Sequence, residues 1–184
     1  MRMDNDKNII ILGAGGHAPV VSEIARACGF VVSAIYDDNP ASVGKNVAGV
    51  AVAGRIADLP DSLTGNAFIA IGNNSVRRSL FERFGNLTWP LLIHPHACVS
   101  SLARLDAGSI VCAGAVIQPG AVLGRQVIVN IGACVDHDSQ VGDFCHIGAM
   151  AYVPVNSEIG VGSHLQPGSR PPFAAKLPPG SIIG

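Results

Sequence analysis

Residues 127–148 read VIVNIGACVDHDSQVGDFCHIG, and within them an aliphatic side chain returns at every sixth position. The same register runs without insertion from Ile93 to Ile183, and Ile, Leu or Val occupies every position of the series except Pro171. Two residues before each aliphatic position the side chain is usually small, as at Ala133 and Ser139. A period of six fits neither the 3.6-residue repeat of an α-helix nor the two-residue alternation of a strand.

The period of six predicts a solenoid with three flat faces, each made of one short strand and a turn. Three hexads give a coil of 18 residues, so Ile93 to Ile183 spans five coils, and coils stack at the strand spacing of about 4.8 Å. Each buried aliphatic side chain contributes roughly 1.5–3 kcal/mol, but only when neighbouring coils stack. We therefore predict an all-β left-handed parallel β-helix over residues 91–184. The alternative is a chance aliphatic recurrence in another β-rich domain.

The region before the repeat follows a different pattern. Residues 8–12 are expected to form a buried strand, residues 13–17 a glycine-rich turn (GAGGH), and residues 19–28 a helix that Gly29 ends. Further strands are expected at 30–36 and 67–71, with a second helix at 75–84. Strand, glycine turn, helix and strand in this order form half of a nucleotide-binding βαβ fold. Residues 1–90 are thus predicted to form a Rossmann-like α/β domain.

The glycine turn and the acidic pair Asp37 and Asp38 indicate a nucleotide ligand. Glycines let a phosphate approach the positive N-terminus of the following helix, and the carboxylates could accept hydrogen bonds from a ribose or a base. GAGGHA also satisfies a loose dinucleotide fingerprint. A full NAD domain needs about six strands, however, and only three are expected here. A nucleotide-linked substrate is therefore favoured over NAD, and a purely structural turn stays open.

The composition excludes several classes of partner. Charged residues make up 14% of the chain and the net charge is -1, so no basic tract is available for nucleic acid. Hydrophobic residues reach 48%, but no apolar run approaches the roughly 18 residues that membrane insertion needs. The polar start, MRMDNDKN, gives no sign of a cleaved signal peptide. The five scattered cysteines indicate reduced thiols and a cytoplasmic protein.

His137 is the strongest candidate for a reactive group. It lies two residues after the inward Val135, so it is expected to point outward, with Asp136 and Asp138 on either side. A carboxylate bonded to one imidazole nitrogen fixes the tautomer and makes the other nitrogen a better base. The alternative is a solvated polar turn. His146 also faces outward half a coil later, and neighbouring prisms of a trimer could bring both faces to one cleft. The other repeat histidines, His94, His96 and His164, are expected to be surface residues.

Four segments together resemble the hexapeptide-repeat acyltransferases. They are IILGAGGH (residues 10–17), IYDDNP (35–40), FIAIGNNSVRRSLFERF (68–84) and the quoted stretch 127–148. More narrowly, the chain is similar to the nucleotide-sugar acetyltransferases of bacterial glycan synthesis. That group includes the UDP-4-amino-sugar N-acetyltransferase of the bacillosamine pathway and relatives of the sialic acid O-acetyltransferases.

This resemblance implies a homotrimer that transfers an acetyl group from acetyl-CoA, without a metal, to the amino group of a nucleotide-linked amino sugar. Matched by position, His137 falls on the general base and Asp138 on its acidic neighbour, while His146, Val155 and Pro167 fall on acetyl-CoA contacts. The implied contacts with the nucleotide sugar are Gly15, Gly16, His17, Asp37, Asp38 and Gly72. Two departures stand out: Ala18-Pro19 replaces a frequent Lys, and Pro167 has no backbone N–H to offer.

Three alternative functions stay open at this stage. The acceptor could be a hydroxyl of a sugar or sialic acid, which would make the protein an O-acetyltransferase. A zinc-dependent β-helical carbonic anhydrase would need three converging histidines, and the close H-x₄-H pair of such enzymes is missing here. A nucleotide-binding scaffold without catalytic activity is the third alternative.

Overall fold

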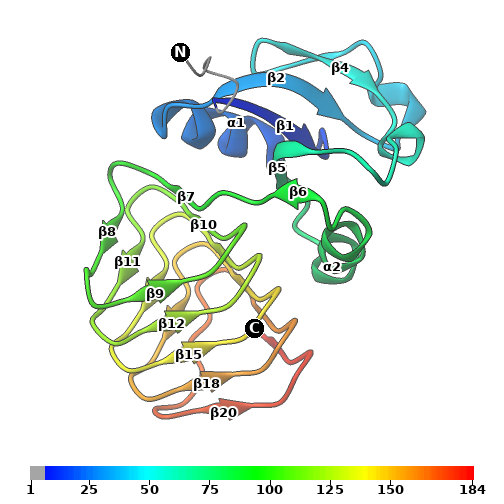
Figure 1. Cartoon of the computed structure of the whole chain (residues 1–184). Helices are drawn as coiled ribbons and strands as arrows, with labels where there is room; N and C mark the ends of the chain where they lie inside the picture. Colours follow the sequence, from blue (N-terminus) through cyan, green and yellow to red (C-terminus); the bar gives the residue numbers. More distant parts are fainter. Residues whose placement is uncertain (1–6) are drawn as a thin grey trace. The chain divides into compact units, whose positions relative to one another are not determined.

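The computed structural model describes residues 7–184, and the chain divides into two compact units (Figure 1). The first unit ends at Pro90 and the second spans Leu91–Gly184. The first six residues of the predicted N-terminal domain lie outside the described residues. Neither unit contains, within residues 7–184, a helix with the length and apolar character needed to cross a bilayer.

The first unit is an α/β domain built on one six-stranded sheet in the order β3-β4-β2-β1-β5-β6. All neighbours in this sheet are parallel except β3 and β4. The central strand β1 is apolar throughout its second half, and Ile9, Ile11 and Leu12 are fully buried. The elements are β1 (Asn8–Leu12), α1 (Ala18–Ala27), β2 (Val31–Tyr36), η1 (Pro40–Ser42), β3 (Asn46–Val47), β4 (Val50–Gly54), η2 (Ile56–Asp58), β5 (Gly65–Ile69), α2 (Asn74–Arg83) and β6 (Leu87–Thr88).

The expectation of three strands before the repeat is wrong. The three predicted strands exist as β1, β2 and β5, with β5 beginning two residues earlier than expected. The missed strands β3, β4 and β6 lie on the two sides of this trio, and β3 and β6 contain only two residues each. Because such short segments form by pairing with an existing sheet, they carry little periodic signal of their own. The number of strands in this sheet therefore gives no argument against a dinucleotide as the ligand.

The second unit is a three-sided coil of two-residue strands, as the period of six predicts (Figure 1). Each strand pairs in parallel with the strand 18 residues further along, for example Ile110 with Ile128. The first sheet contains β7 (Leu92–Ile93), β10 (Ile110–Val111), β13 (Ile128–Val129), β16 (His146–Ile147), β19 (His164–Leu165) and β21 (Ile182–Ile183). The second contains β8 (Cys98–Val99), β11 (Val116–Ile117), β14 (Cys134–Val135) and β17 (Tyr152–Val153). The third contains β9 (Arg104–Leu105), β12 (Val122–Leu123), β15 (Gln140–Val141), β18 (Glu158–Ile159) and β20 (Lys176–Leu177).

The inside of the coil is filled by the two residue series that the sequence predicts. The aliphatic series is buried, with Val135 and Ile147 at zero exposure. The small series is largely buried as well and includes serines, and the hydroxyls of Ser109 and Ser139 are hydrogen-bonded there, whereas Ser169 Oγ has no partner among the described residues. Ser139 Oγ donates to the carbonyl of Pro154 at 2.7 Å, and Ser109 Oγ donates to the carbonyl of Gly124 at 2.8 Å. A buried hydroxyl is tolerated at these positions because each has a backbone partner.

The corners of the coil impose a second, stricter period. From Gly108 to Gly180 every sixth residue has a positive φ, between 49° at Ala174 and 75° at Gly120. Left-handed backbone is cheap for glycine and costly for most other residues. Non-glycine residues nevertheless occupy six of these corners: Gln126, Asp138, Phe144, Met150, Asn156 and Ala174. Asp138, beside the predicted base, is therefore held in a conformation that the coil requires.

The second sheet ends one coil earlier than the other two at the C-terminal end, since it has no strand around Pro171. Its last strand is β17, although the backbone N–H of Tyr152 still donates to the carbonyl of Ser169 at 3.0 Å. The next coil contains Pro171, the exception in the aliphatic series, and Pro172. Pro154, which directly follows β17, has no N–H to continue the ladder. The prolines thus explain why pairing stops on this face.

We expect Gly142→Ala to destabilise the second unit, because successive coils leave no room for a methyl group there. A Cβ at position 142 would lie 2.8 Å from the backbone nitrogen of Val161 and 3.1 Å from the carbonyl oxygen of Ile159. The overpacking should lower the free energy of unfolding by about 1–3 kcal/mol, measured by chemical denaturation. Gly162→Asn is the matched control, since its surroundings are open and Asn tolerates left-handed backbone. Equal stabilities of the two variants would contradict the conclusion that the stacking of successive coils requires glycine at position 142.

Candidate active site

The residues predicted to contact the nucleotide sugar gather at one edge of the first sheet. Strands β2, β1 and β5 are adjacent and parallel, so their carboxyl ends meet at the same edge. The loops that follow them contain the six residues: Gly15, Gly16 and His17 after β1, Asp37 and Asp38 after β2, and Gly72 after β5. Ligands of open parallel sheets bind at this edge, beyond the carboxyl ends of the strands.

The two aspartates hold the backbone of these loops. Asp37 accepts hydrogen bonds from the N–H groups of Ala14 at 2.6 Å and Asn39 at 2.8 Å. Asp38 accepts from the N–H of Ala57 at 2.8 Å. Asp37 thereby fastens the glycine turn to the end of β2. Both carboxylates keep lone pairs for a ligand, but part of their role is to shape the edge itself.

The glycines of the turn serve two different purposes. Gly13 has a φ of 106°, and a Cβ there would lie 2.6 Å from Cγ1 of Ile71, so its glycine is required by the protein's own packing. Gly15 and Gly16 have ordinary φ values, and a Cβ at either position would meet no atom within 4 Å. Both are exposed. The absence of side chains at 15 and 16 leaves their peptide groups open to an approaching ligand.

His17 is a neutral, partly buried imidazole. Its Nε2 is enclosed without a hydrogen-bond partner among the described residues, and the pKa of His17 is lowered to about 4 by burial and by the nearby positive charge of Arg77. Arg77 is itself 1% exposed and donates to the carbonyls of Ile71 and Gly72 and to Oδ1 of Asn74. The loop after β5 is thus tied to a buried cation. The sequence analysis missed Arg77, because an arginine in a helix normally faces solvent.

His137 lies on the outer corner between β14 and β15. Its side chain is 52% exposed, as predicted for an outward residue. Nδ1 of His137 lies 2.9 Å from Oδ2 of Asp138. Since a carboxylate only accepts hydrogen bonds, Nδ1 carries the proton and Nε2 of the neutral ring keeps its lone pair. The hydrogen bond to the Asp138 carboxylate, followed by the charges of Asp136 and Asp138, raises the pKa of His137 above its ordinary value.

The residues predicted to contact acetyl-CoA do not all lie on this corner. Val155 occupies the same corner one coil further on, where the N–H of Asn156 donates to the carbonyl of His137 at 3.3 Å. His146 belongs to β16 in another sheet, and Pro167 follows β19 of that sheet. One chain therefore presents His137 and His146 from different sides of the coil.

His146 is part of a stacked pair of imidazoles. Its ring lies parallel to that of His164, with 4.6 Å between the ring centroids and 8° between the planes. On the other side, Nδ2 of Asn130 lies 3.5 Å from Nε2 of His146. Both histidines are half-buried. His164, expected to be an unremarkable surface residue, thus fixes the ring plane of His146.

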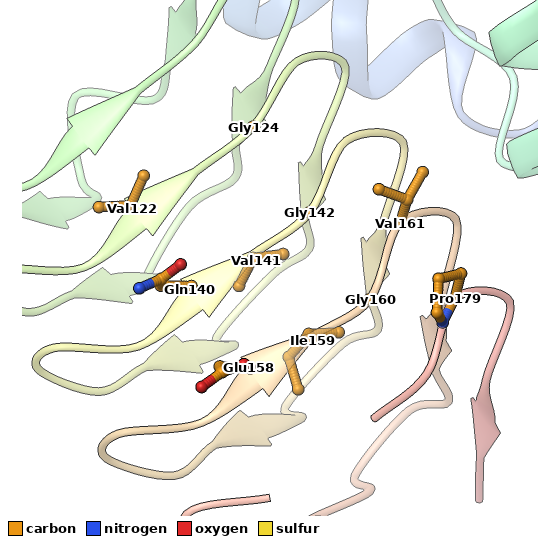
Figure 2. A pocket seen from close by; sticks show the side chains of 10 residues that line it. All are labelled: Val122, Gly124, Gln140, Val141, Gly142, Glu158, Ile159, Gly160, Val161 and Pro179. Carbon is orange, nitrogen blue, oxygen red and sulfur yellow. The ribbon is translucent and has the colours of Figure 1, made fainter. Parts of the chain in front are cut away.

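A hollow of about 360 Å³ lies at another corner, where the third sheet turns into the first, and Figure 2 shows the residues that line it. Three successive coils place a glycine in its lining, and a Cβ at any of the three would lie within 3 Å of an atom of the next coil. The lining contains none of the predicted site residues, so His137 stands outside it. It consists of Val122, Gly124, Gln140, Val141, Gly142, Glu158, Ile159, Gly160, Val161 and Pro179. Within residues 7–184, no group of three or more His, Cys, Asp or Glu side chains could hold a metal ion.

Comparison with known proteins connects both units to acetyltransferases. The family model described as the PglD N-terminal domain matches residues 8–84. UDP-N-acetylbacillosamine N-acetyltransferase of Bacillus subtilis is 36% identical over 117 residues, which cover 58% of this chain and 52% of that protein. The chain thus spans about half the length of this curated relative, and about a quarter of another, an uncharacterized protein of Acanthamoeba polyphaga mimivirus.

Solved structures match along most of the chain. The acetyltransferase domain of PglB from Neisseria gonorrhoeae, in complex with acetyl coenzyme A, is 35% identical with a TM-score of 0.83, covering 92% of this chain and 83% of that one. A mutant of GDP-perosamine N-acetyl transferase from Caulobacter crescentus, in complex with CoA and GDP-perosamine, is 33% identical with a TM-score of 0.80. That match covers 95% of this chain and 92% of that one.

We expect two histidines to titrate on opposite sides of the ordinary pKa of 6.5. In an NMR titration His17 should stay neutral down to a pKa of about 4, and His137 should titrate above 6.5. In Asp138→Gly the pKa of His137 should fall toward 6.5, because the hydrogen bond is lost while glycine keeps the left-handed corner. An unchanged His137 pKa in this variant would show that Asp138 does not tune the ring.

Proposed function

Because the chain belongs to the PglD family of hexapeptide-repeat acetyltransferases, we propose that it transfers the acetyl group of acetyl-CoA to the amino group of a nucleotide-linked amino sugar. The proposal is supported by relatives whose structures contain acetyl coenzyme A, or CoA together with GDP-perosamine. It is further supported by two features of the chain: an exposed, carboxylate-bound histidine on the β-helix and a glycine-rich edge on the α/β sheet.

The single observation that carries the proposal is the pairing of His137 with Asp138. With Nδ1 engaged by Asp138, Nε2 is the basic atom. In the proposed reaction the amine nitrogen attacks the thioester carbonyl carbon and passes its proton to Nε2 of His137. The tetrahedral intermediate then collapses, the carbon–sulfur bond breaks, and CoA leaves as its thiol after accepting a proton. Asp138 stabilises the imidazolium that forms between these steps.

The nucleotide end of the substrate is assigned to the carboxyl edge of the first sheet. The open peptide groups of Gly15 and Gly16 suit a diphosphate next to the N-terminus of α1. His17 adds a neutral, partly buried ring beside them, which can offer a hydrogen bond but no charge to a phosphate. Asp37 and Asp38 are assigned to hydroxyl or amine groups of the nucleotide, with the lone pairs that the backbone leaves over.

We further propose that the active site is completed in a homotrimer. His137 is half exposed, and the hollow of Figure 2 lies at a different corner and does not enclose this residue. His146 and Pro167, the other assigned acetyl-CoA contacts, belong to another side of the coil. Neighbouring chains could bring the two sides together.

None of the five cysteines forms a disulfide, which supports the cytoplasm as the compartment.

His137→Ala should lower kcat by about 10²–10⁴, the usual contribution of a general base, and should leave acetyl-CoA binding intact. Release of the CoA thiol measures turnover, with nucleotide-linked amino sugars tested against the same sugars bearing a hydroxyl. His96→Ala, at an exposed histidine of the first coil, serves as the matched control. A kcat of His137→Ala near the wild-type value would remove His137 from the mechanism. Turnover of only the hydroxyl sugars would replace N-acetylation with O-acetylation.

Mixed oligomers test whether two chains share one site. His137→Ala and His146→Ala should each be inactive alone. When the two are co-expressed, about a quarter of the sites in randomly mixed trimers should combine both wild-type histidines from different chains, and activity should return to that extent. Analytical ultracentrifugation should find three chains per particle. Mixed particles without any recovered activity would argue that each site is built from one chain.

A further inference from the structure

We propose that Tyr152 is a positioning residue for His137 and that it acts through the carboxylate of Asp136. The proposal rests on the proposed role of His137 as the general base. Tyr152 belongs to β17, and Asp136 directly follows β14 in the preceding coil. Neither residue is among those that the family resemblance assigned to the site, and the two are brought together only by the stacking of the coils.

The carboxylate of Asp136 joins the tyrosine to the backbone of the histidine. Oδ1 accepts a hydrogen bond from the N–H of His137 at 2.8 Å. Oδ2 accepts a hydrogen bond from the hydroxyl of Tyr152. With both oxygens engaged, the carboxylate cannot turn about its last bond without breaking one of the two contacts. The direction in which the His137 N–H points is therefore tied to the position of the Tyr152 hydroxyl.

Two further contacts hold His137, and together with the Asp136 link they set the orientation of the ring. The carbonyl of His137 accepts from the N–H of Asn156 at 3.3 Å, so the next coil holds the other side of the residue. The ring is held by Asp138, whose backbone is fixed in the left-handed region with a φ of 58°. The hydrogen bond from the His137 N–H to Asp136 is the remaining contact, and it fixes the backbone where the turn begins. Loss of the tyrosine hydroxyl would loosen this contact and leave the other two in place.

The tyrosine is itself firmly placed. It pairs in register with Cys134 of the preceding coil, and the guanidinium carbon of Arg170 lies 4.8 Å above its ring. The side chain is thus held between β14 and the following coil. Tyr152→Phe would keep the ring and its contact with Arg170, and would remove only the hydroxyl. This makes the substitution a specific probe of the hydrogen bond.

The electrostatics of the pair favour an ionised Asp136. The hydrogen bond from Tyr152 is the largest cause that lowers the pKa of Asp136 below its ordinary value, so the carboxylate is charged at neutral pH. That charge also helps to raise the pKa of His137, although the hydrogen bond that the ring donates to Asp138 has the larger effect. The neighbouring corner residues Pro119, Val155 and Asn156 add no titratable group. Asp136 and Asp138 are therefore the charged groups that set the protonation of the base.

The chain contains a matched control for the local turn. Asp106 accepts a hydrogen bond from the N–H of the next residue, Ala107, at 2.7 Å, in the way that Asp136 accepts from His137. Tyr152 lies sixteen residues after Asp136, and the equivalent position after Asp106 is Val122, which has no hydroxyl. Asp106→Ala therefore removes the same backbone contact at a corner without a reactive histidine.

The experiment measures kcat, KM for acetyl-CoA and the pH profile in the full-length protein. Tyr152→Phe should lower kcat about tenfold through misorientation of the base, with KM changed less than about twofold. Asp136→Ala should lower kcat at least as much and move the acid limb of kcat/KM to lower pH, because a charge that raises the pKa of His137 is lost. In the Asp136→Ala background, Tyr152→Phe should have no further effect. Asp106→Ala should keep the wild-type kcat.

The outcomes distinguish a failure of the positioning role of Tyr152 from a failure of His137 as the general base. A wild-type kcat in Tyr152→Phe overturns the positioning role, as does a Tyr152→Phe loss that persists undiminished in the Asp136→Ala background. If His137→Ala is inactive in the same assay, the base assignment stands in either case. If His137→Ala is active, the base assignment fails and the positioning role fails with it. A loss in Tyr152→Phe that appears only in the thermal midpoint and not in kcat marks the tyrosine as structural.

Discussion

The coil depends on one backbone constraint: the chain must turn every six residues and meet its own previous coil at strand spacing. From Gly108 to Gly180 the turn is made with a left-handed residue each time. Where glycine occupies the corner the conformation is inexpensive, and where Asp138 or Asn156 occupies it a short polar side chain lowers the cost. The aliphatic series can stay buried and in register only while every corner obeys this rule. The hydrophobic core and the corner conformation therefore depend on each other.

The arrangement of His137, the predicted reactive group, follows from this requirement for a left-handed corner. A left-handed corner at Asp138 turns the backbone sharply directly after His137, and the carboxylate then lies against the preceding imidazole at 2.9 Å. The same corner leaves the ring on the outside of a rigid wall, since Val135 is buried and the carbonyl of His137 is held by the next coil. His137, the proposed base, and its carboxylate partner are thus preorganised without a dedicated loop. An ordered arrangement of this kind costs no reorganisation when a substrate binds.

The sequence was sufficient for what repeats and insufficient for what depends on packing between distant segments. The coil, its 18-residue register and the outward His137 follow from a period visible in one dimension. The outer strands β3, β4 and β6 were missed because they form by pairing with strands already in the sheet. Strand β4 pairs with β2, β3 pairs with β4, and β6 pairs with β5. The burial of Arg77 and the lowered pKa of His17 arise where two loops meet. Tyr152 and Asp136 lie sixteen residues apart, and only a comparison of whole coils would have shown them as neighbours.

The exposure of His137 also limits how the chemistry can work. A base that is half open to water is surrounded by competing proton donors and acceptors, and hydrogen bonds to a developing oxyanion are weak in a high dielectric. The hollow lined by Gly124, Gly142 and Gly160 does not relieve this, because it lies at a different corner and its glycines are needed for coil stacking. Water must therefore be excluded by something other than this wall. In the proposed trimer, the substrates and the wall of a second chain would exclude water from this corner, and the proposed base would then face the thioester in a drier environment.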